Sequence, residues 1–171
     1  MNFTTLAGER WGALVQLRVA DVYNEDSTPS EYINFRARTR KAKPKKAAND
    51  SDKPKQVRKN RQVPVHPILK ELLAAYQSES DSVWLFPNRT GEKSIGLRWA
   101  DKILRSAVEK AGLGSKGVST HSTRRSFITN LAHKGGSLAK IKQLTGHTDL
   151  KVLARYIEVT DDDLKQTIAL L

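Results

Sequence analysis

The sequence of 171 residues contains no cysteine, which excludes disulfides, cysteine nucleophiles and thiolate metal sites. It also contains no run of about 18 apolar residues and no basic leader followed by an apolar stretch. We therefore expect no membrane span and no secretory signal, and the composition fits the cytoplasm. No HExxH metal motif, Walker phosphate loop or serine-hydrolase motif is present, so these enzyme classes are not supported.

Positive charge, by contrast, is abundant and concentrated in one segment. The chain carries 30 Lys and Arg residues against 18 Asp and Glu residues, a formal net charge of +12. The segment 36–61 holds +10 of this excess. Such a segment is either a solvated loop or a surface that neutralises phosphates of a nucleic acid. Strand-like sequences at 32–35 and 61–65 bracket it, which favours the tip of a β-hairpin that contacts DNA.

The spacing of apolar residues predicts one mainly helical domain over 1–171 with a small antiparallel sheet, an α+β fold. Strands are expected at 19–23, 32–35 and 61–65. Helices are expected at 10–17, from Pro67, at about 99–111, from about 120, at 138–144, from Asp149 and at 161–171. In the helix at 99–111 the four-residue spacing predicts an inward stripe of Trp99, Ile103, Ala107 and Ala111.

Four short pieces of sequence stand out together. They are Gly8-Glu9-Arg10, His121-Ser122-Thr123-Arg124, Thr145-Gly146-His147 and Tyr156. Each piece alone is common in proteins: a tyrosine on an amphipathic helix usually packs in the core, and a Gly-His pair can be a helix end. Their order and spacing, beside a basic hairpin, are far more specific than any single piece.

This combination resembles the tyrosine recombinase, or phage integrase, family over nearly the whole chain. The resemblance implies the catalytic-domain fold of DNA breaking-rejoining enzymes, and a site-specific recombinase or integrase that cleaves and rejoins double-stranded DNA. It also implies a homotetramer on DNA, in a bacterial cytoplasm and bound to the nucleoid, without membrane or small-molecule substrate. The family's N-terminal DNA-clamping domain is not expected within this chain, and Arg125 stands where a histidine is common in the family.

The resemblance assigns roles that the chemistry of the side chains supports. Arginines stay protonated and grip two phosphate oxygens, so they can neutralise the charge that grows during phosphoryl transfer without a metal or other cofactor. A phenol attacks phosphorus to leave a 3′-phosphotyrosyl bond, histidines exchange or donate protons, and a hairpin lysine protonates the departing 5′-oxygen. The expected catalytic residues are Arg10, Lys41, His121, Arg124, His147 and Tyr156.

Phosphate contacts from the basic segment complete the expected site. The hairpin offers several lysines as the proton donor, among which Lys41 matches the family best and Lys43, Lys45, Lys46 and Lys59 compete. The DNA-binding residues expected around it are Arg36, Arg38, Arg40, Lys43, Lys45, Lys46, Arg58 and Lys59. Two other hypotheses remain open: an inactive DNA-binding module, and a DNA-relaxing enzyme that resembles type IB topoisomerases.

Overall fold

A computed structural model of the chain describes residues 3–39, 60–76, 81–147, 149–154, 156 and 161–169. The fold is mostly helical with one small two-stranded antiparallel sheet, as the sequence predicts. The chain divides into two compact units, one formed by Met1–Trp11 with Arg98–Leu171 and the other by Gly12–Leu97. Within the described ranges, no helix has the length and apolar character needed to cross a lipid bilayer.

The unit Gly12–Leu97 contains the sheet. Strand β1 (Tyr32–Phe35) pairs with strand β2 (Arg61–Pro64), and Phe35 lies opposite Arg61 at the end of the ladder. Helix α3 (Pro67–Ala75) is capped by His66, whose side chain accepts a hydrogen bond from the Ile68 N–H. Among the described side chains of this helix, only Leu69 and Leu73 are buried. The hairpin expected around the basic segment is confirmed at its base.

The strand expected at 19–23 is wrong, since this stretch forms a 3-10 turn, η1 (Val19–Asp21). The Asp21 carboxylate closes this turn by accepting a hydrogen bond of 2.8 Å from the Arg18 N–H. The same carboxylate pairs with Arg36 at 2.6 Å. A second short turn, η2 (Ala37–Thr39), follows β1 and continues to the edge of the described residues.

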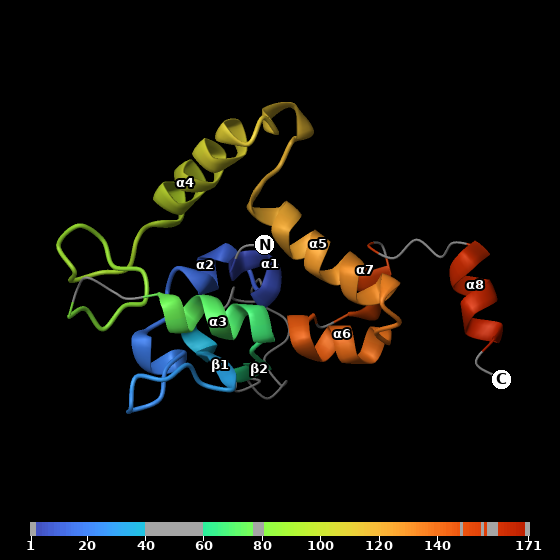
Figure 1. Cartoon of the computed structure of the whole chain (residues 1–171), viewed down its shortest axis with the longest axis horizontal. Coiled ribbons are helices and arrows are strands. Elements are labelled where there is room, and N and C mark those ends of the chain that lie inside the picture. The colour runs from blue at the N-terminus through green and yellow to red at the C-terminus, as the bar shows by residue number, and fades with distance from the viewer. Residues whose placement is uncertain are drawn as a thin grey trace, which may run out of the picture. The chain divides into compact units, whose positions relative to one another are not determined.

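The other unit is built around helix α5 (Thr120–His133), which packs against α1 (Phe3–Ala7) and α6 (Leu138–Thr145). Figure 1 shows α5 beside α6, with α7 (Leu150–Ala154) close to them. The core of this packing contains Ile128, Ile141 and Leu153, which are almost completely buried. Phe127, Leu131, Ala132 and the ring of Tyr156 pack against it.

The other α-helices that the structure describes are α2 (Trp11–Leu14), α4 (Leu97–Lys110) and α8 (Asp161–Ile168). Helix α2 is shorter than the expected 10–17. In α4 the buried residues are Ala100 and Leu104, whereas Trp99 and Ile103 are 56% and 52% exposed. The inward stripe expected for α4 is therefore wrong, because the buried side chains lie one position later in the sequence than predicted. Lys102 lies 5.2 Å from the centre of the Trp99 ring, which is a cation–π distance.

Candidate functional site

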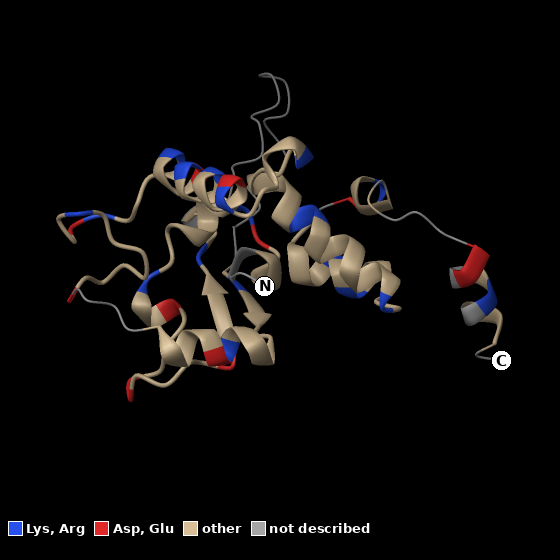
Figure 2. Ribbon diagram, turned by 45° about the horizontal axis from the view of Figure 1, so that its top comes forward, with Lys and Arg blue, Asp and Glu red and all other residues tan. Residues whose placement is uncertain are grey.

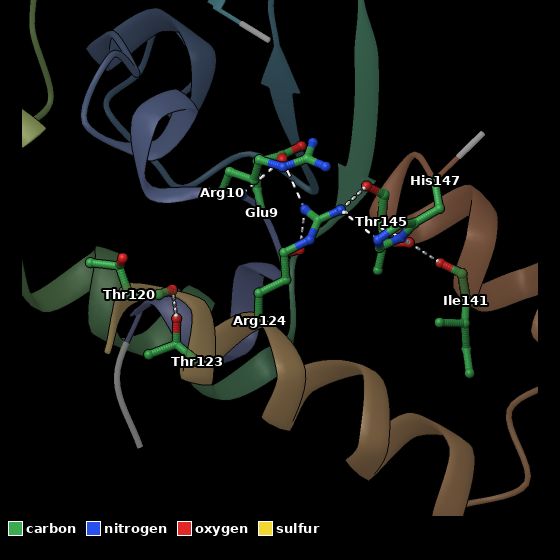
Figure 3. Close-up of polar contacts among 9 residues, drawn as sticks. Glu9, Arg10, Thr120, Thr123, Arg124, Ile141, Thr145 and His147 are labelled. Atoms are coloured by element: carbon green, nitrogen blue, oxygen red, sulfur yellow. Dashed lines mark hydrogen bonds and ion pairs between the residues drawn. The ribbon is translucent and has the colours of Figure 1, made fainter. Parts of the chain in front are cut away.

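The candidate site is centred on Arg124 in the first turns of α5. Ser119 caps this helix, because its hydroxyl and that of Ser122 form a reciprocal capping box with the backbone. Arg124 follows one turn later and is only 6% exposed. A buried guanidinium needs acceptors, since its charge is costly to remove from water. Figure 3 shows that the acceptors come from segments far apart in sequence.

Oxygen acceptors from the N-terminal segment and from α6 hold the Arg124 guanidinium. Its Nη1 donates to the Gly8 carbonyl at 3.0 Å and to the Glu9 carboxylate at 2.9 Å. Its Nη2 donates to the Thr145 carbonyl at 2.8 Å, at the end of α6. The planar fork of arginine thus joins the N-terminal segment, α5 and α6 through both of its terminal nitrogens.

Glu9 connects the two arginines that the sequence singled out. It is 2% exposed, and its Oε1 accepts from both the Arg10 N–H at 2.8 Å and Arg124 Nη1. The side chain of Arg10 is exposed, and Figure 3 shows it at the same end of α5 as Arg124. Removing one partner of such a buried ion pair leaves the other charge unpaired and lowers the stability of the fold by roughly 3–5 kcal/mol.

His147 lies on the other side of Arg124. Gly146 ends α6 in the left-handed conformation (φ 67°), which turns the chain so that His147 returns toward the helix end. Both ring nitrogens lie 3.5 Å from Arg124 Nη2, and Nδ1 lies 2.6 Å from the Thr145 hydroxyl oxygen. The Gly-His piece therefore ends a helix and also places an imidazole beside a buried arginine.

Tyr156 lies just after α7 and is partly buried. Its ring packs against the core of Ile128, Ile141 and Leu153, and its carbonyl accepts a hydrogen bond of 3.3 Å from the Thr129 hydroxyl. The Arg125 guanidinium lies 6.0 Å from the centre of the Tyr156 ring. The segment that carries Tyr156 is thus attached to α5, the helix that carries Arg124.

Gly8 makes the close approach between the N-terminal segment and α5 possible. Its φ is +62°, a left-handed conformation, and a Cβ at this position would lie 2.4 Å from the Phe127 ring. The turn directs the Gly8 carbonyl to Arg124 and is followed by Trp11, whose indole N–H donates to the Thr123 hydroxyl at 3.0 Å. The Gly-Glu-Arg piece therefore has a steric reason for its glycine.

A Gly8→Ala substitution is expected to destabilise the fold by about 2–5 kcal/mol. The left-handed conformation costs an alanine about 1–2 kcal/mol, and overlap with Phe127 adds a further 1–3 kcal/mol. The melting temperature, followed by circular dichroism, should fall by roughly 4–20 °C.

Gly12→Ala is the matched control, because Gly12 has nothing within 4 Å of an added Cβ and lies inside α2. It should leave the melting temperature unchanged or raise it slightly, since alanine favours the helix. Equal melting temperatures for the two variants would contradict this reading of the Gly8 turn.

The other expected site residues stand as follows. His121 is exposed in the first turn of α5, and in the part of the chain that the structure describes we find no hydrogen bond that joins it to Arg124 or His147. Arg36 pairs with Asp21 and donates to the Gln16 carbonyl at 3.1 Å, so it has a structural role. The side chain of Arg38 lies outside the described residues, as do Lys41, Arg40, Lys43, Lys45, Lys46, Arg58 and Lys59.

Two residues of this site were not assigned a role from the sequence, Glu9 and Thr145. Glu9 precedes an arginine, a pattern that usually marks an exposed charged pair, and Thr145 occupies the last turn of a helix. Their significance comes from the contacts of both residues with Arg124 and from the contact of Thr145 with His147. No signal within the single sequence separates them from surface residues.

Comparisons with known proteins indicate one family for the chain. The family profile described as "Phage integrase family" matches residues 1–163. A tyrosine recombinase XerD of Agrobacterium fabrum is 29% identical over 102 residues, which cover 58% of this chain and 31% of that protein. A tyrosine recombinase of Thermosipho africanus is 32% identical over 110 residues, which cover 62% and 37%. The chain thus spans well under half the length of these relatives.

Solved structures share the fold. The crystal structure of XerA recombinase superimposes with a TM-score of 0.68 at 23% identity, covering 98% of this chain and 53% of that one. The site-specific recombinase XerH, bound to its difH substrate in a pre-cleavage complex, gives 0.67 at 19% identity, covering 96% and 43%.

Proposed function

The chain belongs to the phage integrase family, and from this premise we propose that it acts as a tyrosine-type, site-specific DNA recombinase. The observation that carries the proposal is the buried Arg124, held by Gly8, Glu9 and Thr145 with His147 beside it. Arg10 and Tyr156 lie on segments attached to the same helix, by way of Glu9 and Thr129. Segments from both ends of the sequence therefore form hydrogen bonds to α5, either directly at Arg124 or along the helix at Thr129.

The proposed reaction is an in-line displacement at a DNA phosphodiester. The Tyr156 phenol loses its proton and forms a bond to phosphorus, while the bond to the 5′-oxygen breaks and that oxygen gains a proton. The products are a 3′-phosphotyrosyl link and a 5′-hydroxyl. Attack by a 5′-hydroxyl of another strand reverses these steps, so rejoining needs no ATP because the phosphodiester energy is retained.

The positively charged arginines stabilise the negative charge that develops at the phosphate, as a metal ion does in many nucleases. The non-bridging oxygens become more negative as the displacement proceeds, and donors fixed in advance stabilise that charge most effectively. Arg124 is fixed by its acceptors, and Arg10 follows the Gly8 turn directly. Lys41 as the donor to the leaving oxygen, and His121 as a general base or acid, remain parts of the proposal.

The proposed partner is double-stranded DNA, bound as a homotetramer during strand exchange. The XerH relative was solved on its DNA substrate, and a Tn1549 transposon integrase of similar fold was solved with circular intermediate DNA. In this chain an open groove on α5 is lined by Ser122, Arg125, Ser126, Thr129 and Asn130. Figure 2 shows that the Lys and Arg positions along α4 are interspersed with Asp and Glu, so the proposed contact does not include this helix. Hydroxyl, amide and guanidinium donors suit a sugar-phosphate backbone.

A suicide substrate tests the proposal, because loss of a short nicked fragment traps the covalent intermediate. In buffer with EDTA, the protein should accumulate a DNA adduct that migrates slowly on denaturing gels and disappears after protease treatment. Binding without an adduct would favour the inactive module. Relaxation of plasmids that lack any defined site, without strand exchange, would favour the topoisomerase-like alternative.

Arg125 provides a separate test of the groove as a phosphate contact. Arg125→Gln is expected to reduce the slope of log Kd against log salt concentration by about one, and to weaken binding uniformly across sequences. Fluorescence anisotropy over a salt series measures both quantities.

The matched control removes the same charge from α4. Arg105→Gln should leave the salt slope unchanged, because Arg105 is already paired with Asp101 at 2.7 Å. An unchanged slope for Arg125→Gln would exclude the groove from the DNA contact without touching the proposal for Tyr156.

A further inference from the structure

The hydroxyl of Thr145 makes two short contacts. Its oxygen lies 2.7 Å from the Ile141 carbonyl oxygen, one helical turn earlier, and 2.6 Å from His147 Nδ1. Figure 3 shows Thr145 between these two groups, beside Arg124. Thr145 is 1% exposed, so water does not compete for its hydroxyl.

Counting protons fixes the direction of both contacts. A hydroxyl has a single proton to donate, and a carbonyl oxygen has none. At 2.7 Å two oxygens without a proton between them would repel, so the hydroxyl proton lies toward Ile141. The 2.6 Å contact with His147 then needs a proton from the ring, which places one on Nδ1.

We propose that Thr145 is a positioning residue that sets the protonation pattern of His147. The neutral ring is then the Nδ1–H tautomer, and its lone pair is on Nε2. This nitrogen can accept a proton in the neutral ring, and it can donate to a phosphate oxygen only when the ring is doubly protonated. The free imidazole of histidine favours the opposite tautomer, with the proton on Nε2, so the hydroxyl reverses the intrinsic preference.

The same threonine also couples the ring to the arginine. Its carbonyl accepts from Arg124 Nη2, while its side chain accepts from His147. One residue at the end of α6 therefore orients both the guanidinium and the imidazole, through different atoms. A substitution that removes the hydroxyl leaves the carbonyl in place, and this allows the two effects to be separated.

Nuclear magnetic resonance measures the tautomer without DNA. Long-range ¹H–¹⁵N correlations of histidine-labelled protein distinguish Nδ1–H from Nε2–H rings at a pH where the rings are neutral, and His147→Gln assigns the His147 signals. We expect the Nδ1–H pattern in the wild type and in Thr145→Ser. Thr145→Val should shift His147 to the Nε2–H form or to a mixture. Retention of the Nδ1–H form in Thr145→Val would overturn the proposal.

The functional consequence rests on the proposed recombinase activity. At saturating suicide substrate, Thr145→Val should slow adduct formation by about 10- to 100-fold, the size of effect found when the partner that orients a metal-ligating histidine is removed. Thr145→Ser should stay within about threefold, and the Kd for DNA should not change in either variant. A shifted tautomer with an unchanged cleavage rate would overturn the positioning role.

Thr123→Val is the matched control for lost stability. Its hydroxyl is also buried, donates to the Thr120 carbonyl at 3.1 Å and accepts from Trp11. It should lower the melting temperature to a similar degree and leave the His147 tautomer unchanged. If the wild type forms no adduct at all, the proposed function fails, while the tautomer experiment still decides the role of Thr145.

Discussion

The Tyr156→Phe protein is expected to form no covalent adduct with a suicide substrate, a loss of at least about 10³-fold in adduct yield relative to the wild type. The phenyl ring can still pack against Ile128, Ile141 and Leu153, and the contact with Thr129 uses the backbone carbonyl. The fold should therefore survive, and affinity for the uncleaved site should stay within about threefold. Denaturing gels measure the adduct, and anisotropy measures binding.

Tyr23→Phe is the matched control for removal of a phenol elsewhere. Burial, with a smaller effect of Tyr76, raises the pKa of Tyr23, and its hydroxyl donates to the Leu73 carbonyl at 2.8 Å. Loss of that hydrogen bond should cost about 1 kcal/mol of stability and leave the adduct intact. An adduct that persists in Tyr156→Phe would require another nucleophile and would exclude the assigned chemistry.

Local signals in the sequence were sufficient for most helices. Ser137 and Gly146 bound α6 as capping residues do, and Asp149 accepts from the Lys151 N–H at the start of α7. These effects act within one turn of the chain, so they can be read without knowledge of the tertiary fold.

The errors arose where tertiary contacts overrode local preference. The stretch 19–23 has the β-branched and aromatic residues of a strand, yet Asp21 binds the Arg18 N–H and Arg36, which closes a 3-10 turn. In α4 the period of four is correct, but the larger side chains Trp99 and Ile103 are exposed while Ala100 and Leu104 are buried. Periodicity gives the spacing of a face, and packing decides which face is covered.

The candidate site divides in the same way. Residue types and order indicate Arg10, Arg124, His147 and Tyr156 through their resemblance to the tyrosine recombinases, and the chemistry of phosphoryl transfer explains why such groups are needed. Nothing in the order of residues indicates that Glu9 is buried against Arg124, or that Thr145 orients His147. The contact of Glu9 with Arg124 joins residues 115 positions apart, and it forms only when the N-terminal segment packs against α5. The contact of Thr145 with His147 spans two residues, but it depends on the exact turn of the chain at Gly146.

Arg124→Lys is expected to reduce adduct formation by about 10²- to 10³-fold, as removal of a fixed donor to a developing charge does elsewhere. The lysine retains a positive charge, but its single nitrogen cannot replace two guanidinium nitrogens that bind Glu9 and Thr145 on opposite sides. The lysine therefore supplies the positive charge but does not hold it where the guanidinium was held. Single-turnover cleavage measures the loss, and the melting temperature shows how much of it is structural.

Removing both partners of the buried pair distinguishes the catalytic role of Arg124 from its contribution to the stability of the fold. Arg124→Met alone leaves the Glu9 carboxylate buried without its partner and should cost roughly 3–5 kcal/mol. Arg124→Met combined with Glu9→Gln removes both charges, so stability should return toward that of the wild type while cleavage stays absent. Arg105→Lys, at an exposed pair, should change neither quantity. Cleavage restored in the double variant would mean that Arg124 serves the fold alone, and the charge that develops at phosphorus would need another source of stabilisation.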